Sequence, residues 1–119
     1  MDITDGNMII HVDREVDHFT ADRIKTEFEK YYLRGHVKNV IFDMSGVEFM
    51  DSSGIGMIMG KYKKLKYIDG QVMVAAVPDN IDRLLKMSGI YSFILKYDNV
   101  IQAVNSTNNK GESMNGKNI

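Results

Sequence analysis

Residues 51–56 have the order Asp-Ser-Ser-Gly-Ile-Gly, which brings an acid, two hydroxyls and two glycines together. Asp and Ser are residue types that accept hydrogen bonds from the first free N–H groups of a helix. A hydroxyl at this place, flanked by glycines that leave it uncovered, is accessible for covalent modification. The positive end of a helix also tolerates the charge of about −1.5 to −2 that a phosphate adds. The stretch therefore predicts either a plain helix cap or a phosphorylation site at Ser52, and spacing alone leaves both open.

Two elements must position this stretch. Residues 40–44 are a β-branched and aromatic run, which predicts a buried strand. From Ile55 to Leu65 apolar residues recur at three-and-four spacing, which predicts a helix over 52–68 with that face inward. Glycines at 54, 56 and 60 indicate that something lies close to the start of this helix. The opposite, outward face is expected to carry Ser53, Met57, Lys61 and Lys64.

The rest of the chain alternates strands and helices. A hairpin of residues 2–4 and 8–12, turning at Asp5-Gly6, precedes a helix capped by Thr20 and ended by Gly35. Strands are predicted over 71–77 and 91–97, and helices over 79–87 and 99–104. This order predicts an α/β fold with a mixed, mostly parallel sheet of about five strands and about four helices packed mainly on one side. Ser52 would lie at the carboxyl end of a central strand, where such sheets meet ligands and partners. Residues 106–119 are expected to form a disordered polar tail.

Composition excludes several classes of function. The chain has 119 residues, no cysteine and a formal net charge of −1, so thiol chemistry and the basic excess of nucleic-acid binders are absent. Neither a signal peptide nor a run long enough to span a membrane is present in the sequence. We therefore expect a cytoplasmic protein with no membrane or direct nucleic-acid partner.

Catalytic and cofactor roles have little support in the sequence. Gly-x-Ser-x-Gly is absent, and no local signature pairs His11, His18 or His36 with Ser52, so we expect no enzyme. His11 is expected to be a solvent-facing strand residue. The glycines at 54, 56 and 60 depart from the dinucleotide spacing, and no Walker lysine follows them. We expect no cofactor and no metal.

Several motifs in the same order match a known family. Residues 49–56, with Gly-Lys-Tyr-Lys at 60–63, resemble the signature of the STAS domain in anti-sigma factor antagonists of the type that regulates sporulation and stress sigma factors. Segments 15–21, 43–47 and 87–90 are also similar to that family. The resemblance covers residues 8–104, so we expect a single STAS domain over 1–105.

The resemblance implies a protein-binding switch. In that family the serine after the motif aspartate, here Ser52, is phosphorylated by an anti-sigma factor that is itself an ATP-using serine kinase. The unmodified antagonist binds this kinase, which then releases its sigma factor, and a PP2C-type phosphatase restores the serine. The phosphate would join Glu48 and Asp51 in an acidic patch. Alternatives are a STAS interaction module of another signalling assembly and a nucleotide-binding regulatory domain. The expected partner-binding residues are Asp17, His18, Thr20, Met50, Asp51, Ser53, Gly54, Met57 and Lys61.

Overall fold

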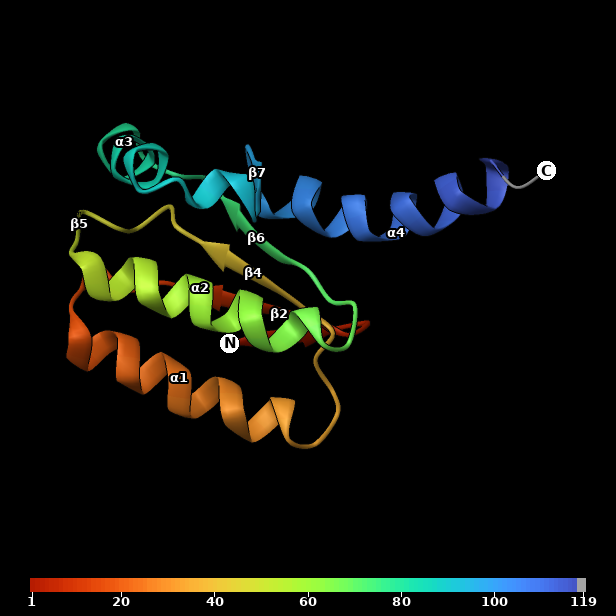
Figure 1. Ribbon diagram of the computed structural model, residues 1–119, viewed down its shortest axis with the longest axis horizontal. Coiled ribbons are helices and arrows are strands. Elements are labelled where there is room, and N and C mark those ends of the chain that lie inside the picture. The colour runs from red at the N-terminus through yellow and green to blue at the C-terminus, as the bar shows by residue number, and fades with distance from the viewer. Residues whose placement is uncertain (118–119) are drawn as a thin grey trace.

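The fold is built on a five-stranded sheet in the order β1-β2-β4-β6-β7 (Figure 1). The computed structural model describes the backbone of residues 1–117 and the side chains of residues 1–108. The strands are β1 (Asp2–Thr4), β2 (Asn7–His11), β4 (Asn39–Asp43), β6 (Val72–Ala75) and β7 (Leu95–Tyr97). Only β1 runs antiparallel to its neighbour, and the other pairs are parallel. The predicted mixed, mostly parallel sheet is therefore confirmed.

The hairpin that joins β1 to β2 turns at the predicted residues. Asp5 and Gly6 have φ angles of 52° and 81°. Positive φ at both central residues is the geometry of the two-residue turn that suits the twist of a hairpin, and Asp-Gly is one of its preferred sequences.

In the described part of the chain, four helices cover the sheet, most of them on one face. They are α1 (His18–Tyr32), α2 (Ser52–Lys66), α3 (Asp79–Ser88) and α4 (Val100–Lys117). Helices α1 and α2 lie side by side over one face, and α4 lies on the other (Figure 1). Alternate side chains of β4 divide between the two faces: Val40 and Phe42 join the core under α1, α2 and α3, whereas Ile41 packs with Ala103 of α4. This division follows from the two-residue period of a strand.

A second, two-stranded sheet was not predicted. It pairs β3 (Glu15–Val16) with β5 (Phe49–Met50) in parallel, with Val16 opposite Met50. A strand of two residues is too short to show a period in the sequence. This small sheet positions two helices, because β3 leads into α1 and β5 leads into α2. The pairing of β3 with β5 therefore holds the N-termini of α1 and α2 next to each other.

Two local predictions were wrong. Asp17, not Thr20, caps α1: its carboxylate accepts the Thr20 amide N–H at 3.0 Å. Asp17 can do so because it lies three residues before Thr20, the spacing at which an N-cap side chain meets a free amide. The expected strand over 91–97 begins later, since residues 90–92 form a short 3-10 helix, η1 (Ile90–Ser92), and β7 starts at Leu95.

The tail of residues 106–119 begins within helix α4, and its disorder stays a prediction. Helix α4 continues to Lys117, and residues 118–119 lie outside the described part of the chain. The Ser106 hydroxyl lies 3.7 Å from the sulfur of Met73, and the Asn7 side-chain amide donates to the Thr107 hydroxyl at 3.3 Å. The residues of α4 that make these contacts with the sheet are polar, so this segment shows no apolar period. The sequence pattern therefore did not reveal the contacts.

Candidate functional site

Ser52 is the first residue of α2 and is exposed. Asp51 precedes it as the N-cap, and the Asp51 carboxylate accepts the Ser53 amide N–H at 2.8 Å. The Asp51 amide in turn donates to the Val16 carbonyl at 3.1 Å, which ties the cap to the neighbouring strand. The Ser52 hydroxyl therefore stands on a fixed turn at the positive end of a helix, open to solvent.

The start of α1 lies beside the start of α2. Since Val16 pairs with Met50, the next residues, Asp17 and Asp51, occupy equivalent positions as the caps of adjacent helices. The hydrogen bond from the Thr20 amide holds the pKa of Asp17 below its ordinary value. Both helices begin at the same end of the molecule (Figure 1). The site thus combines the N-termini of two helices, whose N–H groups and dipoles favour an added negative charge.

Two exposed aromatic residues flank this end and were missed from the sequence. Phe49 on β5 is 54% exposed, and Phe19 in the first turn of α1 is 72% exposed. The ring of Phe19 contacts that of His18, with centroids 4.0 Å apart. Phenylalanine is among the residue types most often buried, so only the structure identifies these rings as surface. Exposed aromatics are enriched at protein interfaces.

Several of the predicted partner-binding residues are buried. Met50 is 6% exposed and lies against Gly54, where an added Cβ would come within 2.5 Å of the Met50 Cγ atom. Gly54 is buried by this contact, which supplies the close approach that the sequence indicated for this one glycine. Met50 and Gly54 therefore shape the turn and do not present side chains to a partner.

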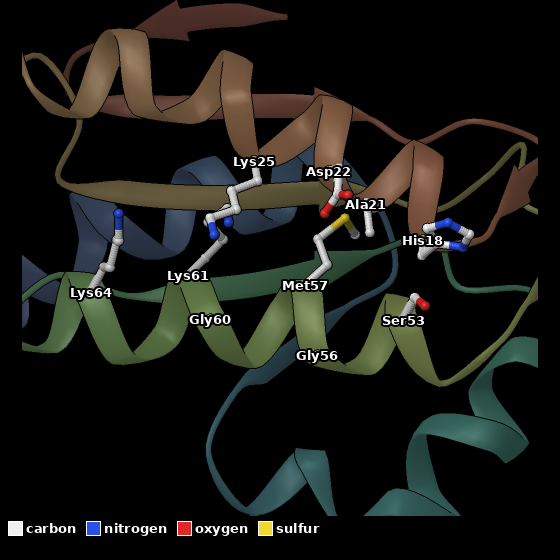
Figure 2. A pocket seen from close by; sticks show the side chains of 10 residues that line it. All are labelled: His18, Ala21, Asp22, Lys25, Ser53, Gly56, Met57, Gly60, Lys61 and Lys64. Carbon is white, nitrogen blue, oxygen red and sulfur yellow. The ribbon is translucent and has the colours of Figure 1, made fainter.

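The predicted outward face of α2 was also wrong. Met57 and Lys61 are 6% and 3% exposed, respectively, because α2 is covered by the sheet on one side and by α1 on another. Figure 2 shows both side chains in the seam between the two helices, in line with Ser53 and Lys64. A helix with two packed neighbours exposes a narrower arc than the amphipathic pattern implies. Met57 and Lys61 are therefore buried, and their role in partner binding stays a prediction.

Charge around the site is more balanced than expected. The predicted acidic patch included Glu48, but its carboxylate pairs with the Arg14 guanidinium. The fold brings several residues assigned to the site together at one end of the molecule. These are His18 and Thr20 on α1 with its cap Asp17, and Ser52 and Ser53 on α2 with its cap Asp51.

His11 lies outside this site and has partners of its own. Its ring nitrogens lie 2.8 Å from an Asp43 oxygen and 3.0 Å from an Asp2 oxygen. These two hydrogen bonds raise the pKa of His11, and the one with Asp2 has the larger effect. The expectation of a solvent-facing strand residue is confirmed. The sequence did not show its two partners, because Asp2 is brought by the hairpin and Asp43 by the pairing of β2 with β4.

Comparison with known proteins identifies the family. The family model of the STAS domain matches residues 1–105. An anti-sigma F factor antagonist of Paenibacillus polymyxa is 32% identical over 99 residues, covering 83% of this chain and 85% of the relative. An anti-sigma-B factor antagonist of Listeria monocytogenes is 30% identical over 99 residues, with the same coverage.

Solved structures share the fold. The unphosphorylated form of the anti-sigma factor antagonist SpoIIAA superposes with a TM-score of 0.82 at 20% identity, covering 92% of this chain and 94% of the other. A putative anti-sigma factor antagonist of Thermotoga maritima gives a TM-score of 0.80 at 21% identity, covering 88% and 90%. Among the described residues, no helix combines the length and the apolar character needed to cross a membrane. Because the family model matches most of the chain, the chain belongs to the STAS domain family.

Proposed function

We propose that this protein is an anti-sigma factor antagonist that works as a phosphorylation switch at Ser52. In its unmodified form it binds a serine-kinase anti-sigma factor, which then releases its sigma factor. The names of the curated relatives support the class of protein. The observation that carries the switch is the exposed Ser52 hydroxyl, fixed at the start of α2 by the Asp51 cap beside a second helix N-terminus.

The chemistry is a phosphoryl transfer and its reversal. The kinase moves the terminal phosphoryl group of ATP to the Ser52 oxygen: a new P–O bond forms, the bond to ADP breaks, and the serine proton passes to a base of the kinase. A PP2C-type phosphatase then hydrolyses the ester with water and returns serine and free phosphate. This protein supplies the accessible hydroxyl acceptor for the kinase and the accessible phosphate ester for the phosphatase, and no catalytic group.

The phosphate would change the surface while leaving the fold in place. Free N–H groups and the helix dipole stabilise an anion in the first turn of α2. The partner, in contrast, must desolvate a group with about −1.5 to −2 charges where it met a neutral hydroxyl. Phe49 and Phe19 supply apolar contact area next to the switch, so the phosphate acts at the edge of a docking surface. Such control corresponds to a change in affinity of about 5- to 150-fold.

The test is phosphorylation of the full chain by its cognate anti-sigma factor kinase with ATP, followed by mass spectrometry of the modified peptide. We expect one phosphate on Ser52, which Ser52→Ala removes. Ser53→Ala is the matched control, because it changes the adjacent hydroxyl and should leave labelling intact. Labelling that persists in Ser52→Ala, or is lost only in Ser53→Ala, would contradict the assignment.

Binding and stability are measured on the same proteins. Ser52→Asp should weaken kinase binding by about 5- to 150-fold, while its melting temperature stays near that of the wild type because acids suit a first helical turn. Thr26→Asp adds the same charge to an exposed position of α1 and should bind normally. Normal binding by Ser52→Asp would refute the switch. Labelling by ATP without a kinase would favour a nucleotide-binding domain, and capture of a partner other than a kinase would favour another signalling assembly.

A further inference from the structure

The C-terminal ends of α1 and α2 form a surface that is separate from the Ser52 site. The two helices begin at the same end of the molecule and lie side by side, so they also end together, and α4 lies on the other face of the sheet (Figure 1). The Lys64 ammonium of α2 pairs with Glu29 of α1 and lies 5.5 Å from the centroid of the Tyr32 ring. Since α2 has 15 residues, this surface is about 20 Å from Ser52.

Positive charge is concentrated at this end. The loops that follow the two helices are in contact, because the Lys38 carbonyl takes the place that a Cβ on Gly70 would need. Five cations are exposed on these loops and on the last turns of the helices, namely Lys30, Arg34, Lys38, Lys63 and Lys66. Among the described side chains, none of these five forms an ion pair. Two exposed acids lie nearby, Asp69 after α2 and Asp5 in the hairpin turn that meets Lys38, and they offset only part of the charge.

Three apolar side chains protrude among these cations. Leu33 and Tyr67, which follow α1 and α2, are 78% and 90% exposed, and Ile68 is 44% exposed. Side chains this exposed add little to the core, and their burial against a partner is favourable. Tyrosine, with an apolar ring and a polar tip, suits a boundary between water and an apolar phase. These three residues and the five cations form one surface, the basic end of the molecule.

Helix dipoles account for only part of the basic end. The negative end of a helix favours cations, which explains the lysines in the last turns of α1 and α2. It explains neither Lys38, in the loop beyond α1, nor the three protruding apolar side chains. Cations around protruding apolar groups complement a surface that is anionic on the outside and apolar beneath.

We propose that the basic end binds the surface of a membrane that contains anionic lipids. The cations lie at the level of the lipid headgroups, and Leu33 and Tyr67 insert between the headgroups. A folded protein would need matching pockets for side chains that protrude this far, whereas a fluid headgroup layer makes room for them. The expectation of no membrane partner rested on the lack of a signal peptide and of a spanning run, and surface binding requires neither. Ser52 points away from the membrane and stays accessible to the kinase.

The test is co-sedimentation of the full-length protein with vesicles near neutral pH. No kinase is present, so the result does not depend on the switch at Ser52. The vesicles contain phosphatidylcholine alone, or phosphatidylcholine with an equal amount of phosphatidylglycerol. We expect the anionic vesicles to bind at least about tenfold more tightly than the neutral ones. Raising the salt from about 0.1 M to about 1 M shortens the Debye length from about 10 Å to about 3 Å and should release most of the bound protein.

Charge variants locate the surface that binds. Arg34→Gln combined with Lys66→Gln removes two cations of the basic end. It should weaken binding to the anionic vesicles about tenfold or more, because one cation near such a surface contributes about fivefold. Arg14→Gln combined with Arg83→Gln is the matched control, which removes the same charge from exposed positions outside the basic end. It should bind within about twofold of the wild type.

Apolar variants test insertion at constant charge. Leu33→Ala combined with Tyr67→Ala shortens the two most exposed apolar side chains of the basic end and should weaken binding about fivefold or more. Met87→Ala combined with Ile101→Ala is the control, because these residues are 83% and 72% exposed on α3 and α4, and it should bind as the wild type does. Circular dichroism checks that every variant is folded.

Four results would each overturn the proposal. The first is no preference for the anionic vesicles at low salt. The second is an equal loss of binding in the two charge variants, which would indicate general attraction to cations anywhere on the protein. The third is unchanged vesicle binding by Leu33→Ala with Tyr67→Ala, which would show that nothing inserts. The last is displacement of the protein from vesicles by polyglutamate at the same ionic strength, which would assign the basic end to an acidic protein segment.

Discussion

Replacing Lys61 by methionine is expected to make the protein more stable near neutral pH. The pKa of Lys61 falls from 10.5 to about 8 in the fold. Because one unit of pKa corresponds to about 1.4 kcal/mol, and solvent at the ammonium screens part of the effect, this charge costs the fold at most about 3 kcal/mol. The contact with the Phe28 ring at 5.0 Å returns about 0.5–2 kcal/mol of that cost. Methionine fills a similar volume without a charge, so the free energy of unfolding should rise by about 1–2 kcal/mol.

The pH dependence provides a sharper test than the stability at a single pH. The folded pKa of Lys61 is lower than the unfolded one, so the unfolded state binds more protons between pH 8 and 10.5. The free energy of unfolding of the wild type should therefore rise as the pH increases through this window. Lys61→Met lacks this titration. Its advantage over the wild type should be largest below pH 8 and should shrink towards pH 10.5.

The assay is urea unfolding followed by circular dichroism, at a series of pH values on both sides of pH 8. Lys63→Met serves as the control, since Lys63 is exposed on the same helix and should unfold like the wild type at each pH. The reasoning would be refuted if Lys61→Met were less stable than the wild type near neutral pH. A constant difference across the whole pH range would refute it as well, because the effect would then come from packing and not from charge.

Two further comparisons test the site. Gly54→Ala should lower the free energy of unfolding by about 1–3 kcal/mol, because its Cβ would lie 2.5 Å from the Met50 Cγ atom. Gly56→Ala, whose Cβ would have no atom within 4 Å, should raise it by about 0.5–1 kcal/mol in thermal unfolding. Equal effects would show that the two glycines do not differ in packing. Phe49→Ala should weaken kinase binding about tenfold or more in calorimetry, with little change in melting temperature. Tyr67→Ala, at a 90% exposed position at the other end of α2, is the control and should bind normally. Equal losses of affinity would place the docking surface elsewhere.

The main helices and strands could be predicted because their signals are local. Asp5-Gly6 specifies the first hairpin, the apolar period specifies α2, and Gly89 in the left-handed region ends α3. Asp51 and the serines predicted the start of α2 to within one residue, since a cap and the amide it binds are neighbours in the chain. The alternation of strands and helices was enough to predict a mostly parallel sheet.

The sequence alone thus determined the four helices, the strands of the five-stranded sheet, their order and the place of Ser52 at a helix N-terminus. Only the tertiary structure decided which faces are covered. The pairing of β3 with β5 places the starts of α1 and α2 side by side, and the packing of α1 against α2 buries Met57 and Lys61. A pattern within one helix records which face is apolar, but the number of neighbours that cover the helix depends on segments distant in the sequence. The tertiary structure also leaves Phe49 exposed and buries most of the Lys61 side chain, and no local sequence pattern indicates either feature.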